Sequence, residues 1–312
     1  MVQHFSIKNI AVASLLKNKK MTTRFCGFIL WAWCALAGCT SRNAGSEAGN
    51  APAKEYNQLA TYFNQTWAKA KHWDDGLAEV AIYDAERMIY GKNRAYEYAV
   101  LTVKEDFNRE NNVKTDDYTR NDLFEVLKVN SFARIETDNY PYHYLTSVFI
   151  LRDRPWALHK LTTSSQEWCG NTFKSITDKG ANFDLSYNSY FDGQGTGMHQ
   201  LPKELLVEDQ LPYTLRALKF TDNPTFDANI LETQQTNQAK APVVYKAHIR
   251  SINAQLNEAE VWQVQVQLDS AKVNSYWFAK AYPNHLLQQQ TWDGRNLKLK
   301  KISRYAYWKR DS

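Results

Sequence analysis

The feature that most limits the fold of this chain is a period of two in its apolar residues, repeated along most of its length. Residues 261–268 read VWQVQVQL, so that Val and Leu largely alternate with Gln. Successive side chains of a strand point to opposite faces of a sheet, and this alternation is typical of a strand with one wet face. Because helices do not alternate regularly with such segments, an antiparallel sheet is favoured over a parallel one.

Several further segments share this strand-like pattern. Strands are expected at 78–90, 95–103, 123–135, 142–151, 157–163, 171–176, 181–190, 243–252, 261–268, 275–281, 286–292 and 297–308. Tyr90-Gly91 and Asp178-Lys179-Gly180 are turn sequences of the kind that connect hairpins. Both halves of the chain hold consecutive strands rich in Tyr and Trp, so the large curved antiparallel sheet could consist of two half-sheets joined through residues 200–240.

Two segments are expected to be helical, which makes the class mainly β with some α. An N-terminal helix is predicted over 52–71 from apolar residues spaced by three and four, namely Tyr56, Leu59, Phe63, Trp67 and Ala70. A short helical segment is predicted within 202–220, which is rich in Leu, with a break at Pro212. Residues 193–197, which read GQGTG, are expected to form a loop, and so is the polar stretch 220–241.

The first 38 residues have the order of a secretory signal. A basic start at Met21-Thr22-Thr23-Arg24 precedes an apolar run over 25–37, and Gly38 is small. That run is shorter than the roughly 20 residues that a spanning helix needs. Residues 1–20 are either a long basic extension of the signal, or they precede a true start at Met21.

Leu36-Ala37-Gly38-Cys39 resembles the lipobox of bacterial lipoproteins. The resemblance implies that Cys39 is acylated after cleavage, and that the protein is held to a membrane through this lipid. The next residue is Thr40 rather than Asp, which by the same resemblance implies an outer-membrane lipoprotein that faces the periplasm. Residues 39–53 then form the lipidated Cys and a flexible tether, and 54–312 form a single β-rich domain.

Charge and cysteine content restrict the partners. Five of the 38 basic residues and none of the 33 acidic residues precede Cys39, so the rest of the chain has no net charge. A nucleic-acid-binding protein normally carries a basic surface, so no nucleic-acid partner is expected. Beyond Cys39 a single cysteine, Cys169, remains, and the domain therefore has no internal disulfide.

Several motifs are similar to those of an uncharacterised family of envelope lipoproteins found mainly in Bacteroidetes-type genomes. They are Trp73–Glu79, Tyr90-Gly91, Glu105-Asp106-Phe107, Tyr140-Pro141-Tyr142 and, most specifically, Ser164–Gly170, which reads SSQEWCG. The resemblance implies no established activity. Some members carry the label septum formation inhibitor Maf, but true Maf proteins are cytoplasmic α/β nucleotide hydrolases, which a secreted β-rich chain does not resemble. The strand pattern is also loosely similar to LolA- and LolB-like carriers, whose sheets curl around a helix.

The candidate catalytic residue is Cys169, with His143 or His159 as a base and Glu167 nearby. A nucleophilic thiol needs such a base within hydrogen-bond reach. The alternative, which we favour, is a small buried residue beside Trp168. The seven histidines have no metal-ligand spacing, so no metal site is expected, and no cofactor is expected either.

The chain is rich in aromatic residues, with 10 Trp, 18 Tyr and 14 Phe. They either line a concave ligand site or simply fill the core of a large sheet. The hypothesis we favour is a non-catalytic, lipid-anchored envelope protein that binds an apolar or amphipathic lipid-like ligand, or an envelope protein. The alternatives are an envelope hydrolase that depends on Cys169 and a structural subunit of an outer-membrane assembly.

Overall fold

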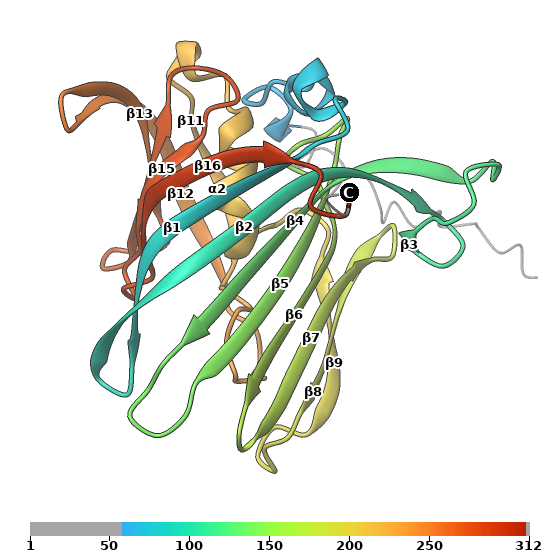
Figure 1. Cartoon of the computed structure of the whole chain (residues 1–312), viewed down its shortest axis with the longest axis vertical. Helices are drawn as coiled ribbons and strands as arrows, with labels where there is room; N and C mark the ends of the chain where they lie inside the picture. Colours follow the sequence, from blue (N-terminus) through green and yellow to red (C-terminus); the bar gives the residue numbers. More distant parts are fainter. Residues whose placement is uncertain (1–57, 310–312) are drawn as a thin grey trace, which may run out of the picture. The chain divides into compact units, whose positions relative to one another are not determined.

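One sheet of sixteen strands dominates the computed structural model, which describes residues 58–309 (Figure 1). The strands are β1 (Ala78–Ile89), β2 (Lys92–Asn108), β3 (Val113–Lys114), β4 (Leu123–Ile135), β5 (Tyr142–Leu151), β6 (Leu158–Glu167), β7 (Gly170–Asp178), β8 (Asn182–Ser189), β9 (Thr196–Pro202), β10 (Leu206–Val207), β11 (Thr225–Leu231), β12 (Val244–Leu256), β13 (Ala259–Gln267), β14 (Val273–Ala279), β15 (Leu286–Gln290) and β16 (Asn296–Tyr305). The described residues all belong to one compact unit.

The sheet consists of two antiparallel meanders that meet at its middle. The strand order is β10-β11-β12-β13-β14-β15-β16-β1-β2-β4-β5-β6-β7-β8-β9, and β3 pairs with β2 off this path. Neighbouring strands are antiparallel, apart from a short parallel contact between β10 and β11. The two halves expected from the sequence are therefore one continuous open sheet, because β1 pairs with both β2 and β16.

The alternation in the sequence separates an inner from an outer face. In β5 the side chains of Tyr142, Tyr144, Thr146, Val148 and Ile150 are buried, whereas the residues between them are more exposed. The strands expected at 123–135 and 142–151 have those bounds in the structure, and the turns at Tyr90 and at Gly180 join β1 to β2 and β7 to β8. The mainly antiparallel β class is confirmed.

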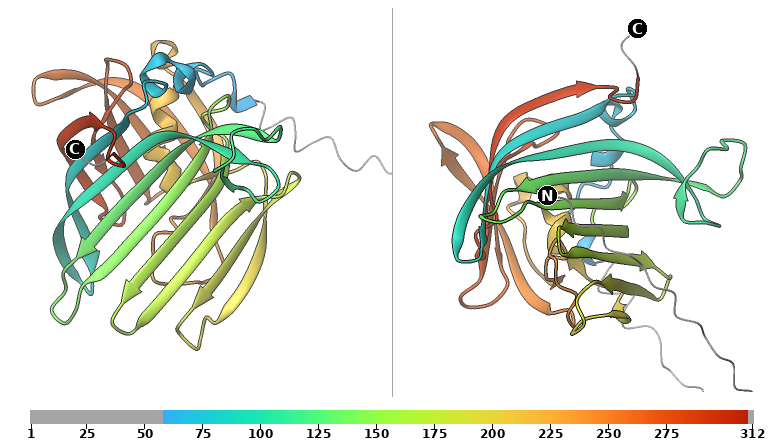
Figure 2. Two further views of the ribbon diagram at one scale, coloured as in Figure 1. Left: turned by 45° about the vertical axis from the view of Figure 1, so that its right-hand side comes forward. Right: turned by 60° about the horizontal axis from the view of Figure 1, so that its bottom comes forward.

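A short helical segment lies on the inner face, and the sheet curls around it (Figure 2). It contains the helices η3 (Glu208–Gln210), α2 (Leu211–Thr214), η4 (Leu215–Ala217) and η5 (Phe220–Asp222). Its leucines are buried against the sheet, and the Gln210 side chain donates to the Trp156 carbonyl at 3.0 Å. The segment expected within 202–220 is confirmed, but Pro212 lies in the first turn of α2 rather than between helices. The first turn tolerates proline because its N–H groups have no intrahelical partner.

The N-terminal helix predicted over 52–71 is wrong after Leu59, and residues 52–57 lie outside the described part of the chain. Helical geometry ends at Leu59, and turns with two short 3-10 helices follow, η1 (Trp67–Lys69) and η2 (Lys71–Trp73). Phe63 instead forms a bridge with Leu218, and the Asn64 N–H donates to the Ala217 carbonyl at 2.7 Å. The spacing did identify buried residues, because Leu59, Phe63 and Trp67 are all in the core.

Two segments expected as loops contain strands. Within GQGTG the loop ends at Gly195, and β9 starts at Thr196 because it pairs with β8. The Tyr187 side chain covers Gly197 so closely that a Cβ there would collide with it. In 220–241 the residues Thr225–Leu231 form β11, whereas the part after Leu231 has no strand.

A buried ion pair connects the helical segment to the centre of the sheet. Glu79 of β1 and Arg216 of η4 form two hydrogen bonds, of 2.8 and 3.1 Å, and both side chains are nearly inaccessible to solvent. The Arg216 guanidinium lies over the rings of Trp67 and Trp73 and also donates to the Pro283 carbonyl. Nε2 of His285 lies 3.0 Å from the Glu79 carboxylate. Arg216 and His285 hold the pKa of the Glu79 carboxyl well below its usual value, despite its burial.

Candidate functional site

The inner face of β4–β7 changes from apolar to polar along the strands. Cross-strand pairing aligns Val129, Val148, Leu161 and Ile176 in one row. The next inward-facing row toward the β4–β5 turn consists of Ser131, Thr146, Thr163 and Lys174. The row beyond it contains Ala133, Tyr144, Ser165 and Thr172. We call the last two rows, together with Arg87 of β1 and Tyr98 of β2, the inner polar surface.

The inner polar surface is buried although it lies on the concave side of an open sheet. Thr163, Ser165, Thr172 and Lys174 are each at most 3% exposed. Buried polar groups cost free energy unless they are hydrogen-bonded, so something must contact this surface. Residues 233–239, which we call the strap, connect β11 to β12 and supply many of these contacts.

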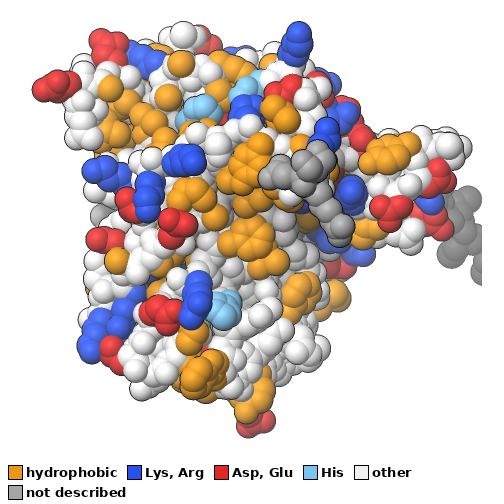
Figure 3. Space-filling view, in the orientation of Figure 1, with side chains coloured by type: hydrophobic (Ala, Val, Ile, Leu, Met, Phe, Trp, Pro, Cys, Tyr) orange, Lys and Arg blue, Asp and Glu red, His pale blue; other side chains and the backbone are white. Residues whose placement is uncertain are grey.

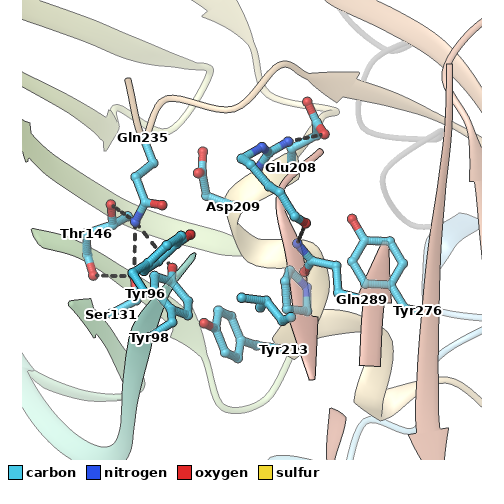
Figure 4. A pocket seen from close by; sticks show the side chains of 13 residues that line it. Tyr96, Tyr98, Ser131, Thr146, Glu208, Asp209, Tyr213, Gln235, Tyr276 and Gln289 are labelled. Atoms are coloured by element: carbon cyan, nitrogen blue, oxygen red, sulfur yellow. Dashed lines mark hydrogen bonds and ion pairs between the residues drawn. The ribbon is translucent and has the colours of Figure 1, made fainter. Parts of the chain in front are cut away.

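Gln235 is the deepest residue of the strap. Its side-chain nitrogen donates to the Thr146 hydroxyl at 3.0 Å and to the Tyr98 hydroxyl at 3.2 Å (Figure 4). Its backbone carbonyl accepts from Nη2 of Arg87 at 2.7 Å. The strap thus inserts a neutral amide between strands of the sheet and the helical segment.

The rest of the strap is held in the same way, by side chains that bond to its backbone. Thr172 donates to the Asn237 carbonyl at 2.9 Å, and Lys174 donates to the Gln238 carbonyl at 2.9 Å. At the other end the two carboxylate oxygens of Asp209 accept from the Thr233 hydroxyl and the Gln234 N–H, each at 2.7 Å. These contacts bury no large apolar side chain of the strap.

Arg87 and Lys174 are buried cations without a carboxylate partner. Neither has an ion pair within 4.0 Å among the described residues, although Arg87 lies over the Tyr144 ring. Burial lowers the pKa of the Lys174 ammonium to about 8, so that most molecules still carry this charge at neutral pH. Nη1 of Arg87 and Oγ of Ser165 are buried and have no hydrogen-bond partner among the residues that the structure describes.

A small polar cavity of about 30 Å³ adjoins Gln235. It lies between the helical segment and both halves of the sheet, and Tyr96, Tyr98, Asp209 and Tyr213 line it (Figure 4). Burial raises the pKa of Tyr98 and Tyr213, so their phenols stay neutral and can donate hydrogen bonds. Binding sites for small organic ligands are about tenfold larger, so with the strap in place this cavity has room for water only.

The wall opposite the strap is fixed by an ion cluster. Arg295, in the turn after β15, donates to Glu208 of η3 at 2.9 Å and to Asp293 at 2.8 Å. Asn274 of β14 donates to the same Glu208 carboxylate at 2.7 Å. This wall is held by pairs of opposite charges, whereas on the strap side each charged side chain bonds to a neutral group of the strap.

The residues singled out by the sequence do not form a catalytic group. Cys169 is exposed in the turn between β6 and β7, and its Sγ lies 3.0 Å from the Tyr140 hydroxyl, which is 3.3 Å from Glu167. His143 points to the outer face of β5 and pairs across the sheet with Gln166. His159 lies at the far end of β6, beside Asn112 and Asp178. At about 3.3 Å per strand residue, it is about 30 Å from Cys169. Glu167 and the thiol thus share the Tyr140 hydroxyl, whereas no hydrogen bond joins either histidine to the thiol among the described residues, and the thiol is not buried.

Other expectations fall on the part of the chain that the structure does not describe, which includes the signal segment, Cys39, the tether and the residues up to Asn57. Within 58–309 no group of three or more His, Cys, Asp or Glu side chains is placed to hold a metal ion. No helix among these residues is long and apolar enough to cross a membrane. Sequence reasoning missed Arg87, Lys174 and the strap, and their one available signal was the Gln- and Asn-rich run at 234–238.

Comparison with known proteins adds little. No family model matches the chain, and no curated protein matches it. A crystal structure of a β-barrel-like protein with a domain of unknown function, DUF1849, from Brucella abortus is similar, with a TM-score of 0.45 and 9% sequence identity. The match covers 73% of this chain and 98% of that chain. This likeness carries no argument about function, which has to come from the site itself.

Proposed function

We propose that this protein is a lipid-anchored, non-catalytic binding protein of the bacterial envelope, attached through Cys39. Its ligand is an amphipathic molecule or an extended segment of an envelope protein, held on the inner polar surface once the strap has moved aside. The observation that carries the proposal is the strap itself, a polar segment that covers a polar concave face through hydrogen bonds, three of which run from sheet side chains to its backbone carbonyls.

The character of the inner polar surface selects among ligands. Its hydroxyl, phenol, guanidinium and ammonium groups would lose hydrogen bonds against a bare acyl chain, at a cost of about 1–3 kcal/mol for each unsatisfied buried group. A ligand with polar groups along its length replaces the contacts of the strap. The amphipathic and protein ligands therefore fit this surface better than a purely apolar one.

Exposed apolar residues on the outer face also support the proposal of an envelope protein as a partner. Phe132, Leu145 and Phe173 lie on the outer faces of β4, β5 and β7 and are each about two-fifths exposed. Figure 3 shows hydrophobic side chains gathered over these strands. Cross-strand pairing joins Phe132 to Leu145 directly, and Ser164 of β6 separates Leu145 from Phe173. An exposed apolar band of this kind is typical of a protein contact surface.

Hydrogen exchange of the full chain in mild detergent tests the movement of the strap. We expect the amides of Gln234 and Ala239, which donate to side chains, to exchange through local opening. Amides of β5 should exchange at least a hundredfold more slowly and serve as the internal reference. If strap and β5 amides exchange only together, in the global unfolding transition, the strap is a fixed part of the core and the proposed binding site is wrong.

Acylation is tested separately. Radiolabelled palmitate should enter the full chain but not its Cys39→Ser variant, and that variant should leave the membrane fraction. A Cys39→Ser protein that still sediments with membranes would refute the anchor without affecting the site.

A further inference from the structure

The strap occupies the inner polar surface in the manner of a bound peptide. Three of the sheet's contacts with it are to backbone carbonyls, because Arg87, Thr172 and Lys174 donate to the carbonyls of Gln235, Asn237 and Gln238 respectively. Such contacts do not depend on the side chains of the strap. Any extended chain that places carbonyls at these positions satisfies the same donors.

Unlike the other buried arginines, the cations of this surface have no carboxylate within 4.0 Å among the described residues, although burial of Lys174 is partly offset by the more distant Asp209 and Glu232. Arg152 pairs with Asp74 and Glu125, and Arg216 pairs with Glu79. Arg87 and Lys174 have only neutral oxygens from the strap as hydrogen-bond acceptors among the described residues. Moreover, Nη1 of Arg87 is buried and has no hydrogen-bond partner among the described residues, so only Nη2 of the two terminal nitrogens is paired.

We propose that the strap is a placeholder, and that the segment which displaces it is an extended acidic peptide whose carboxylates pair with Arg87 and Lys174. This inference rests on the proposed function and names the ligand class of the same site. A carboxylate at Arg87 accepts from both Nη1 and Nη2, and thereby satisfies the donor that the strap leaves unpaired. In the strap, Arg87 and Lys174 contact backbone carbonyls and the Thr236 hydroxyl, so the carboxylates of the ligand would lie where these neutral oxygens lie now.

Two carboxylates of the site also contact the strap: Glu167 accepts from the Asn237 side-chain amide at 3.2 Å, and Asp209 acts at the other end of the peptide. Asp209 accepts from the Gln234 N–H and the Thr233 hydroxyl, so it binds the donors of the incoming chain. The surface therefore has a direction, with an acceptor at one end and two cations further along. A simple anion such as phosphate has no chain of donors for Asp209, which is why we favour a peptide.

The test measures the binding of labelled hexapeptides to the full chain in mild detergent by fluorescence anisotropy. The host is the Gln235→Ala variant, whose strap has lost its deepest hydrogen bonds and competes less with added peptide. The probes are Thr-Glu-Glu-Thr-Asn-Glu, which keeps the Asn whose amide Glu167 accepts from, and its amide counterpart Thr-Gln-Gln-Thr-Asn-Gln. We expect the acidic peptide to bind at least tenfold more tightly, and hydrogen exchange in residues 233–239 to rise when it binds.

Charge variants assign the contacts. Lys174→Gln and Arg87→Gln should each weaken binding of the acidic peptide at least tenfold, whereas Lys174→Arg should retain most of it. Lys179→Gln, in the exposed turn beyond β7, is the matched control and should change nothing. If Arg87→Gln does not fold, as judged by circular dichroism, the Lys174 pair alone decides the outcome.

Four outcomes overturn the acidic-peptide proposal. They are equal affinity for the two peptides, affinity insensitive to Lys174→Gln, no measurable binding to the Gln235→Ala host, and equal competition by inorganic phosphate, which would indicate a general anion site. None of them affects the exchange experiment on the strap. A strap that opens locally but does not prefer acidic peptide would leave the proposed function in place and reject only its ligand class.

Discussion

Replacement of Glu79 by Gln should be among the most destabilising conservative changes in this chain. The substitution keeps the shape of the side chain but leaves Arg216, which is 4% exposed, without its carboxylate. Removal of one partner from a buried ion pair costs about 3–5 kcal/mol, because an uncompensated charge stays buried. Stacking on Trp67 and Trp73 remains in the variant and offsets part of this cost, so we expect about 3 kcal/mol.

The assay is urea unfolding of the full chain, followed by far-UV circular dichroism. Glu136→Gln is the matched control, because the Arg134–Glu136 pair is about two-thirds exposed and such pairs contribute less than about 1 kcal/mol. The double variant Glu79→Leu/Arg216→Met should be closer to wild type than Glu79→Gln alone, since no charge is then left unpaired. A Glu79→Gln protein within about 1 kcal/mol of wild type would refute the argument that this ion pair is desolvated.

Acid provides a second readout of the same pair. The pKa of Glu79 is depressed in the folded state, so the stability it contributes is present above its unfolded pKa of about 4.5 and is lost as the pH falls below that value. Wild type should therefore lose more stability than Glu79→Gln between about pH 5 and pH 3. Parallel acid titrations of the two proteins would contradict the depressed pKa.

Three further predictions concern the site. The pKa of Lys174 is lowered by burial to about 8, so between about pH 8 and pH 9.5 the unfolded chain holds a proton that the native protein has lost, and stability should rise by up to about 1 kcal/mol per pH unit. Urea titrations of Lys174→Met should show no such rise, and a rise of equal size in this variant would contradict the assignment. Gln235→Ala removes hydrogen bonds to Thr146 and Tyr98, so it should cost about 1–3 kcal/mol in urea unfolding and speed exchange in the strap, whereas Gln238→Ala, on an exposed strap residue, should cost far less. Cys169 is exposed, so a thiol reagent should label it without denaturant, and labelling that requires denaturant would mean that the turn is covered.

The sequence predicted the sheet better than the segments that cover it. Alternation located β4 and β5 because each of these strands has one face in the core and one toward solvent. It missed β9, which begins within the loop-like sequence GQGTG, because the edge of β8 determines that strand through pairing. It also predicted a helix where Asn64 and Phe63 bond to the distant residues Ala217 and Leu218. Contacts over such distances in the sequence leave no local periodicity.

The site was less predictable still. Ser131, Thr146, Thr163 and Lys174 lie on four different strands, and only the cross-strand register aligns them in one row. Each of them alone is an ordinary polar residue in a strand. The strap has no period, because its position depends on side chains from elsewhere in the chain. Cys169 was a candidate as a lone thiol, but its distance from His159 could be known only once β6 was seen to extend from one residue nearly to the other.

The pairing of β1 with β16 has a consequence for biosynthesis. The centre of the sheet is closed by the final strand, so a chain leaving the ribosome exposes an open edge on β1 until Tyr305 has emerged. Folding must then join segments that are far apart in the sequence, and such high contact order slows it. A truncation before Asn296 would remove β16, the strand that joins the two meanders, rather than shorten one edge of the sheet. The strands β1–β9 can pair locally as they emerge, but the second meander can join them only after β16 is complete.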